Sequence, residues 1–459
     1  MNNIIAVFSK RNYKFTTPRL LQGGLYLTGA SSLLLLIAII SAVQGQRQAI
    51  KTVGLDATPS IVTAQRLKDA FAGMDAYVAN ELLLPPGQNP DAVKGYEERY
   101  TRATERLVIA AENISFGEKE RKTIQKMQLG FGNYIAKIQQ ARDFHARGDI
   151  NGMLVAFRAS AEIMDKTLLP TADELDQLNF QVLNQIYTEQ RVAASKPLLL
   201  IMICGAALII VLVEMQIFLS LRMRRIFNPL LLVATAIALL LVTYTTTTLR
   251  SATENLRIAK EEAFDSIHAL RLARAAGYIA NATKTRYLLD PTFATNYEKA
   301  FFQNIAQIAE IPPGQTAQSI ANIYNSSGKK VDGFKGYIAD ELDNLSFPGE
   351  KQATIATLEI VGQYLAVDQQ IRQLERSGKH QEAIALAVGK KPGQSNWLFE
   401  EFKKANSTTF DINQAAFDKA IKQGFSDVDG FEMKTGVAIG MIAILSFCGV
   451  LPRLKEYSS

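Results

Sequence analysis

The chain has 459 residues, of which 48% are hydrophobic and 20% are charged, and its formal net charge is +6. The mean hydropathy of +0.03 hides a strong segregation, because the apolar residues gather in four runs and the rest of the sequence is polar. The basic excess lies beside the apolar runs and the long polar segments carry both signs interspersed, so nucleic acid is not an expected partner.

The four apolar runs are each predicted to cross a membrane as a helix. Crossing the hydrocarbon core takes about 20 apolar residues, with a lower limit near 17. The first three runs are long enough. The fourth is short, but no neighbouring segment could bury it. The two cysteines, Cys204 and Cys448, both lie in these runs, so the polar segments hold no disulfide and depend on packing.

The flanks of the runs set the expected topology. Each short flank is basic, with Lys10, Arg11, Lys14 and Arg19 before the first run, Arg222, Arg224 and Arg225 between the second and third, and Arg453 and Lys455 after the fourth. Basic flanks stay in the cytoplasm, so both termini are expected inside and the two long segments outside. A cleaved signal peptide is the competing interpretation of the N-terminus, but its apolar region is usually only about 7–15 residues.

This topology gives a full domain order for a multi-pass cell-membrane protein. The expected order is a basic cytoplasmic segment 1–24, a span 25–44, an outer bundle 45–196, a span 197–221, a cytoplasmic loop 222–229, a span 230–249, an outer bundle 250–434, a span 435–451 and a cytoplasmic tail 452–459.

Both outer segments are predicted to be all-helical. Strand-like alternation is absent, and Ile124, Met127, Phe131, Ile135 and Ile138 recur at the spacing of one helix face. Breaks divide the first segment into helices at about 45–84, 90–114, 117–147 and 150–195. Four such helices between two spans predict an antiparallel four-helix bundle. The fold class is therefore all-α, with four transmembrane helices that carry two tandem extracytoplasmic bundles.

The second segment repeats landmarks of the first in the same order. NISFGEK at 113–119 is echoed by NLSFPGEK at 344–351. Further pairs are Ser60-Ile61 with Ser266-Ile267, Leu82-Leu83 with Leu288-Leu289, Tyr96-Glu97 with Tyr297-Glu298, Gln139-Gln140 with Gln369-Gln370, Arg142 with Arg372, and Gly148 with Gly378. Ordered matches of this kind indicate a tandem duplication of span, bundle and span. The second copy carries an insertion near 311–335, expected to be a membrane-distal loop.

The NISFGEK motif is interpreted as the start of a helix. Ser115 and Glu118 have the spacing of a capping box, and Pro348 in the first turn is expected to compensate for the shifted Glu350 in the copy. The alternative is N-glycosylation. Its candidate sites are Asn113, Asn281, Asn325, Asn344 and Asn406.

Enzyme chemistry finds little support in the sequence. His145, His268 and His380 lack metal-ligand spacing, and no nucleophile elbow, Walker loop or dinucleotide fingerprint is present. We expect no catalytic residue, metal or cofactor.

Four groups of residues are candidates for other functions. Arg271 and Arg274 on a predicted helix, with His268 and Asn281 near them, could bind a carboxylate, although arginines on a bundle helix usually face solvent. Gly436 and Gly440 form a GxxxG pattern that favours span packing. Glu214 lies near the inner end of the second span and is either an interfacial residue or a functional one. Signal output is expected from Arg222, Arg224 and Arg225.

Architecture and several stretches resemble known sensor proteins. Span, four-helix bundle and span is the arrangement of bacterial chemoreceptor and histidine-kinase sensor modules, and RRIFNPL at 224–230 resembles the start of a HAMP linker. AFDSIHAL at 263–270, Ala273-Arg274 and RYLLD at 286–290 are similar to four-span actinobacterial membrane proteins with tandem extracytoplasmic bundles. That resemblance implies a link between an amino-acid-binding lipoprotein outside and a soluble Ser/Thr kinase inside.

Two function classes follow from these patterns. The first is an integral membrane sensor that detects a solute or a solute-binding protein and signals to a separate cytoplasmic partner, such as a Ser/Thr kinase. The second is a scaffold subunit of an envelope, secretion or junction complex. In either class we expect the chain to form a homo-oligomer in the membrane.

Overall fold

The computed structural model describes residues 17–114, 117–193, 195–223 and 228–456. Over these residues the chain is helical, without a strand and with one isolated β-bridge, so the predicted all-α class is confirmed. The chain divides into two compact units. A membrane unit comprises residues 1–51, 186–256 and 422–459, and an outer unit comprises residues 52–185 and 257–421.

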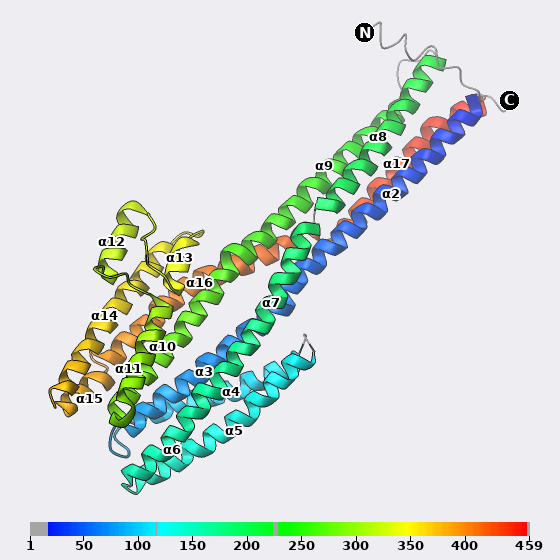
Figure 1. Cartoon of the computed structure of the whole chain (residues 1–459). Coiled ribbons are helices and arrows are strands. Elements are labelled where there is room, and N and C mark those ends of the chain that lie inside the picture. Colours follow the sequence, from blue (N-terminus) through cyan, green and yellow to red (C-terminus); the bar gives the residue numbers. More distant parts are fainter. Residues whose placement is uncertain (1–16, 115–116, 194, 224–227, 457–459) are drawn as a thin grey trace. The chain divides into compact units, whose positions relative to one another are not determined.

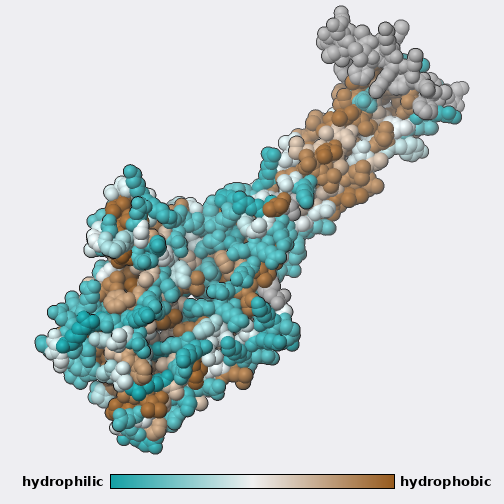
Figure 2. Space-filling model, viewed as in Figure 1, coloured by the Kyte–Doolittle hydropathy of each residue, from teal (hydrophilic) through white to brown (hydrophobic). Residues whose placement is uncertain are grey.

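Four helices of the membrane unit are long and apolar enough to cross a membrane. They are α2 (Thr17–Lys51), α8 (Ser195–Met223), α9 (Pro229–Arg257) and α17 (Phe431–Lys455). Leucine, isoleucine and phenylalanine side chains are exposed along all four, and Figure 2 shows the apolar surface they form. Because exposed apolar side chains of this density are unfavourable in water, this surface fits contact with lipid.

Contacts between neighbouring helices hold the membrane unit together (Figure 1). Asn228 at the start of α9 donates its side-chain N–H to the Gly449 carbonyl of α17 at 2.6 Å. The rings of Tyr244 and Phe431 stack at 5.2 Å between centroids, and Gly205 of α8 lies directly against the Val242 side chain of α9. α2 packs against both α8 and α17, so the four helices form one bundle.

The outer unit has a first and a second half. The first half consists of η1 (Thr52–Ala57), α3 (Thr58–Leu82), α4 (Pro90–Glu112), α5 (Glu118–Ala146), α6 (Ile150–Ile163), η2 (Met164–Leu168) and α7 (Leu169–Ala193). The second half consists of η3 (Ile258–Phe264), α10 (Asp265–Leu289), η4 (Pro291–Phe293), α11 (Ala294–Ile308), α12 (Ala317–Ser327), α13 (Tyr337–Asp343), α14 (Glu350–Arg376), α15 (His380–Val388) and α16 (Ser395–Val428). α7 and α16 continue into the membrane unit.

Local sequence explains the helix boundaries. Asn89 caps α4 by accepting from the Ala92 N–H, with Pro90 at the first helical position, and Asp149 caps α6 in the same way. Gly148 and Gly378 adopt φ values of +75° and +73° at the corners that end α5 and α14. Glycine is the residue that takes such left-handed conformations without a Cβ penalty.

The two halves share one hydrophobic core. α3 and α10 pack along each other, and the core cluster runs from Leu67 and Phe71 in the first half to Phe301 and Phe399 in the second. Both helices are rich in buried alanine, whose small side chain lets two backbones approach closely. The four-helix segments therefore do not form separate cores. We call the contact between α3 and α10, with the side chains that cross it, the seam.

Two π-helical segments, η1 and η3, stand at equivalent places in the two halves. η1 begins at Thr52 and η3 begins at Ile258. These two residues are as far apart in the sequence as the matched residues Ser60 and Ser266. Each segment leads directly into a seam helix, and α9, η3 and α10 follow one another without a loop. π-helical turns are rare and occur frequently at functional sites.

The NISFGEK interpretation is partly wrong. Ser115 lies outside the described residues, and α5 begins at Glu118 after Gly117, whose φ is +88°. In the copy, Gly349 also has φ +88°, and Glu350 reaches back to accept from the backbone N–H groups of Ser346 and Phe347 at 2.8 and 2.9 Å. Pro348 lies in the turn before the helix, so the prediction that it occupies the first helical turn is wrong.

Burial at two positions and side-chain hydrogen bonding at a third argue against glycosylation of three candidate asparagines in the folded chain. Asn281 and Asn406 are buried. The Asn344 side chain donates to the carbonyls of Glu261 and Glu262 in η3, each at 3.1 Å. The second-copy motif thus holds the π-helical segment, a role that the sequence did not reveal.

The insertion near 311–335 is more ordered than the predicted loop. It contains α12, and the backbones of Glu310 and Lys335 pair across its base. The Glu310 N–H donates to the Lys335 carbonyl at 2.8 Å.

Candidate functional site

The deepest polar contact of the seam is centred on Arg286 of α10. Its guanidinium donates to Asp75 of α3 at 2.5 Å and to Asp165 of η2 at 2.7 Å, and only 1% of the arginine is exposed. Burial raises the pKa of Asp75 to about 6 against the opposing effect of Arg286. Burial disfavours charge on Arg286 as well, but Asp75 and Asp165 outweigh it and raise the pKa of the arginine. This group joins the halves, and its Arg286–Asp75 pair is closed to solvent whereas Asp165 is exposed.

A second buried cation, Lys284, lies two residues before Arg286 on α10. Its Nζ donates to Asn281 Oδ1 and Ser395 Oγ at 2.8 Å and to the Ala387 carbonyl at 3.1 Å. Burial lowers the pKa of Lys284 to about 7. The Tyr364 hydroxyl also donates to Asn281 Oδ1, at 3.1 Å. The carbonyl side of the Asn281 amide is therefore fully engaged.

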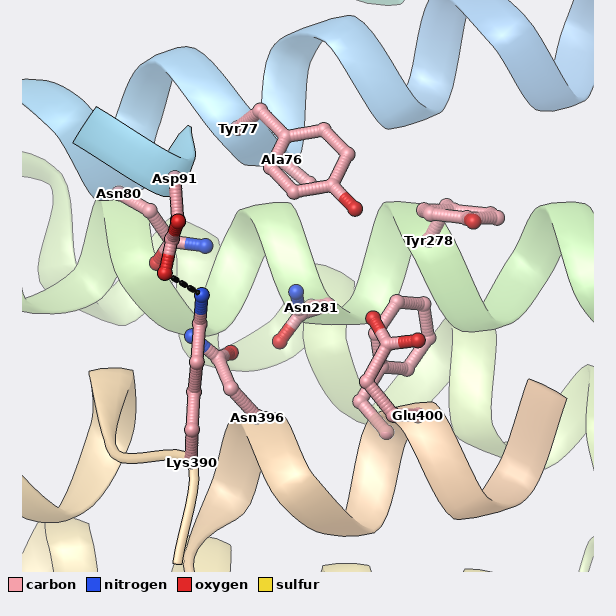
Figure 3. Close-up of a pocket in the computed structure, with 10 residues that line it drawn as sticks. Ala76, Tyr77, Asn80, Asp91, Tyr278, Asn281, Lys390, Asn396 and Glu400 are labelled. Carbon is pink, nitrogen blue, oxygen red and sulfur yellow. Dashed lines mark hydrogen bonds and ion pairs between the residues drawn. The ribbon is translucent and has the colours of Figure 1, made fainter. Parts of the chain in front are cut away.

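A cavity of about 190 Å³ lies between α3, α10 and the start of α16. Figure 3 shows Asn281 between a Lys390–Asp91 ion pair on one side and Glu400 on the other. The wall is buried and the rim is exposed. The lining residues are Ala76, Tyr77, Asn80, Asp91, Tyr278, Asn281, Lys390, Asn396, Phe399 and Glu400. Residues from both halves thus build one site.

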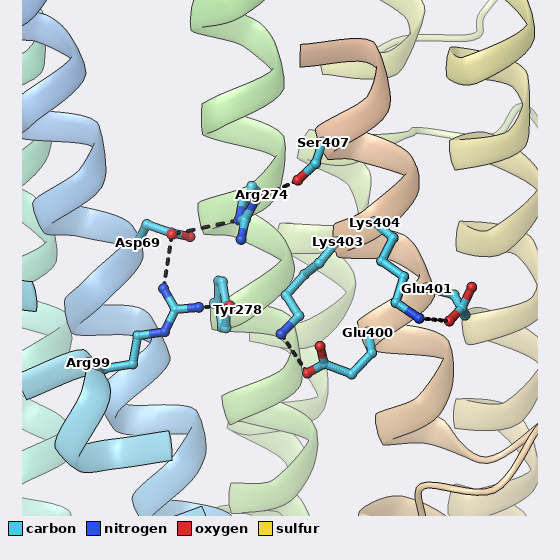
Figure 4. A network of polar contacts seen from close by, with 9 residues as sticks. All are labelled: Asp69, Arg99, Arg274, Tyr278, Glu400, Glu401, Lys403, Lys404 and Ser407. Carbon is cyan, nitrogen blue, oxygen red and sulfur yellow. Dashed lines mark hydrogen bonds and ion pairs between the residues drawn. The ribbon is translucent and has the colours of Figure 1, made fainter. Parts of the chain in front are cut away.

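Arg274, one of the two predicted carboxylate-binding arginines, lies at the seam (Figure 4). Arg274 donates to Ser407 Oγ at 2.9 Å, and its Nε lies 3.7 Å from Asp69 Oδ2. Arg99 of α4 donates to the same oxygen at 3.1 Å and also to the Tyr278 hydroxyl. Arg271 covers the Phe410 ring at 4.3 Å. Burial, and then Arg66, lower the pKa of Arg271 to about 9, which indicates an excess of positive charge here.

The other two predicted ligand residues do not join this cluster. His268 stacks on the Phe180 ring with 4.2 Å between centroids, and its Nε2 lies 2.9 Å from Asp176 Oδ2. Asn281 lies further along α10 and lines the cavity. The four candidates therefore fall at three places along one helix.

The structure also places the predicted membrane-unit residues. Over the described residues, no atom lies within 4 Å of a Cβ built at Gly436 or Gly440, so no other helix of the described chain packs against them and their packing role stays a prediction. A close approach is made at Gly449, where an added Cβ would lie 3.2 Å from Asn228 Oδ1. Glu214 is exposed on α8 and lines a groove with Arg19.

The predicted output residues are only partly described. Arg222 is exposed in the last turn of α8, whereas Arg224 and Arg225 lie outside the described residues. Within the described part of the chain, no group of three or more histidine, cysteine, aspartate or glutamate side chains could hold a metal ion.

Comparison with known proteins gives one match. The model of a family described as actinobacterial sensor domain matches residues 49–188, which is less than half of the chain. The match covers η1 and α3 to α6, and most of α7. The curated proteins and the solved structures gave no match. The sensor-domain match and the four candidate membrane helices support a membrane sensor.

Sequence reasoning missed the buried charges and the cavity. At the sequence offset that relates Ser60 to Ser266, Lys284 and Arg286 stand where the first half has Val78 and Asn80. A cation that appears on one copy of an alanine-rich helix is a signal that could have found them. The cavity residues come from distant segments, so no local pattern marks them.

Proposed function

We propose that this chain is an integral membrane sensor whose outer unit receives a solute or a solute-binding protein and passes a conformational signal to a separate cytoplasmic partner. The observation that carries the proposal is the place of the π-helical segments. η1 and η3 join the seam helices α3 and α10 to the candidate spans α2 and α9. A shift in the seam thus has a short helical path to the membrane.

The proposal needs two states that an input distinguishes, because a ligand shifts an equilibrium only by its different affinity for the two states. The seam offers such a contact. It is held by directional polar pairs, including Arg158 with Asp290 at 2.7 Å and Thr285 with Asn80 at 3.0 Å. Side-chain pairs of this kind have discrete alternatives, whereas a purely apolar contact would repack gradually.

The two halves are further proposed to be copies of one module. Gly117 and Gly349 share φ +88°. Arg142 NH1 lies 3.8 Å from Glu97, and the matched Arg372 NH1 lies 3.7 Å from the matched Glu298. The equivalent ion pairs support the duplication that the sequence indicates, whereas the two glycines share φ but differ in ψ, at −157° and −15°.

The topology and the partners belong to the proposal as well. Basic flanks support a cytoplasmic location for both termini and for the loop 222–229, where a partner would read the signal. The resemblance to four-span actinobacterial proteins supports an amino-acid-binding lipoprotein as the input and a Ser/Thr kinase as the output. No catalytic step is assigned to the chain itself.

The test is crosslinking in intact cells, followed by purification of the full chain and identification of its partners with and without added L-glutamate and L-aspartate. We expect a solute-binding protein and a Ser/Thr kinase, with yields that change when the amino acids are added. Partners that include neither, in yields that ignore the amino acids, would overturn the proposal. Envelope-assembly proteins alone would favour the scaffold function.

A further inference from the structure

We infer that the cavity between α3, α10 and the start of α16 is a binding site for a small zwitterion that carries a carboxylate and an ammonium group, such as a free α-amino acid. The inference deepens the proposed function, since it takes the outer unit as the sensing part. It places a ligand on this chain itself rather than only on a separate binding protein.

The wall of the cavity is built and not incidental. Asn281 is 3% exposed and Asn80 is 4% exposed, yet both line the cavity. Lysine Nζ can only donate hydrogen bonds, so the bond from Lys284 fixes the Asn281 oxygen on the far side of the amide. The Asn281 amide nitrogen is therefore directed into the cavity, as Figure 3 shows. It offers a buried donor for a carboxylate oxygen.

A second amide supplies the opposite polarity. Asn396 donates its Nδ2 to the Val388 carbonyl at 3.1 Å, and a carbonyl can only accept, so its Oδ1 faces the other way. That oxygen is buried and has no hydrogen-bond partner in the described part of the chain. An unsatisfied buried acceptor costs about 1–3 kcal/mol, and because this oxygen is closed to the cavity, a ligand N–H group reaches it only when the Asn396 side chain turns.

The rim carries both charges, at opposite sides. Lys390 stands at one side, where its ammonium pairs with Asp91, and Glu400 stands at the other, where it pairs with Lys403 at 2.5 Å. Figure 3 shows Asn281 between them. The Lys390–Asp91 pair is more than half exposed on both sides, so it is weak and open to exchange. A ligand carboxylate would be placed at Lys390 and its ammonium at Glu400.

The size of the cavity sets the size of the ligand. Pockets for drug-sized molecules occupy roughly 300–1,000 Å³. A cavity of about 190 Å³ takes a smaller molecule. The aromatic rings of Tyr77, Tyr278 and Phe399 line it and leave room for a short apolar side chain.

The site also explains how binding would reach the seam. Asp91 belongs to α4 of the first half, whereas Lys390 belongs to the segment between α15 and α16 of the second half. A ligand carboxylate that competes for Lys390 changes a contact between the halves. Asn281 is part of α10 and bonds to Lys284 next to Arg286, so the ligand also contacts the seam.

The experiment is calorimetric titration of the full chain in nanodiscs with glycine, L-alanine and L-serine. N-acetyl-L-alanine lacks the ammonium group, and L-alanine methyl ester lacks the carboxylate. We expect at least one free amino acid to bind and both capped compounds to bind at least about tenfold more weakly. Lys390→Ala and Glu400→Gln should each weaken binding by a similar factor. Lys379→Ala, an exposed lysine outside the cavity, should leave binding unchanged.

Three results would overturn the assignment. They are no binding of any free amino acid at about 10 mM, equal binding of free and capped compounds, and unchanged binding by both rim variants. Each rim residue is exposed, so the variants are expected to fold, and their melting temperatures confirm this. If the partners of the proposed function are still recovered, only the ligand assignment fails and the sensor proposal stands.

Discussion

The two halves of the outer unit differ most at the helices through which they meet. α3 and α10 occupy matching places in their halves, yet α3 contributes Asp69 and Asp75 to the seam whereas α10 contributes Arg274 and Arg286. Opposite charges on the two helices make each half complementary to the other. Two identical halves would instead place like charges together. The difference indicates that the seam is specific for one copy against the other.

Away from the seam the matched arginines make partly similar contacts. Arg142 NH1 lies 3.8 Å from Glu97, and the matched Arg372 NH1 lies 3.7 Å from the matched Glu298. Each arginine also lies over a tyrosine ring, but the rings belong to the unmatched residues Tyr96 and Tyr287. This ion pair is thus alike in the two halves, whereas the charges at the seam differ.

Breaking the charge asymmetry should have the largest effect. Arg286→Met leaves Asp75 buried without its partner, and loss of one member of a buried pair costs about 3–5 kcal/mol. We expect a loss of that size in the free energy of unfolding, with faster hydrogen exchange in both α3 and α10. The control is Arg376→Met, which removes an exposed ion pair with Glu298 and should cost less than about 1 kcal/mol. Equal effects of the two variants would contradict the account.

A pH experiment tests a second difference between the two halves, a buried carboxyl group that only the second half contains at this position. Glu341 stands where the first half has Ala110, at the offset of the NISFGEK pair, and Asn413 donates to both Glu341 and Glu350 at 3.1 and 2.7 Å. Burial, and then Glu350, raise the pKa of Glu341 from 4.5 to about 8. The folded chain thus keeps a proton that the unfolded chain releases, so this group makes stability fall between pH 4.5 and 8.

Glu341→Gln removes that titration. We expect the stability of the wild type relative to the variant to fall over this range, by an amount on the order of a few kcal/mol. Urea unfolding at several pH values measures it, and the comparison cancels the groups that do not interact with Glu341. Glu118→Gln, an exposed carboxylate beside the matched corner, should leave the slope unchanged. Parallel pH profiles for the wild type and Glu341→Gln would refute the assignment.

The two corner glycines provide the smallest test. Gly349→Ala places an alanine in the left-handed region at φ +88° and ψ −15°, which costs about 1–2 kcal/mol. Gly117→Ala places one at φ +88° and ψ −157°, a region essentially confined to glycine, so its loss of thermal stability should be the larger. Gly132→Ala, inside α5 with no atom near its Cβ, should stabilise slightly. A larger loss at Gly349 than at Gly117 would contradict this expectation.

Much of the fold could be predicted from the sequence. The apolar runs located the four candidate spans because the required length is set by the membrane. Helix boundaries were predicted at breaks in the first segment, and the observed ones coincide with Pro90 and with glycines at corners, which act through local backbone geometry. Such signals are contained in a few neighbouring residues.

The candidate site was less accessible. Arg286 and Lys284 would be expected in solvent on any bundle helix, and only the structure shows that carboxylates and carbonyls from distant segments surround them. Arg271 and Arg274 were predicted as anion-binding residues, and they lie in a cluster with excess positive charge. Gly436 has no close neighbour among the described residues, and a GxxxG pattern does not say which face of the helix meets a neighbour in the same chain.

Photo-crosslinking from position 222 in native membranes tests whether a change at the seam is transmitted to the cytoplasmic side. Arg222 suits this experiment because it is exposed at the end of α8. The wild type is compared with Arg274→Met, which alters the seam while Arg99 still pairs with Asp69. The account predicts that the variant folds and that the amount of captured cytoplasmic partner changes. Identical capture by the two chains would contradict transmission from the seam to the cytoplasmic side.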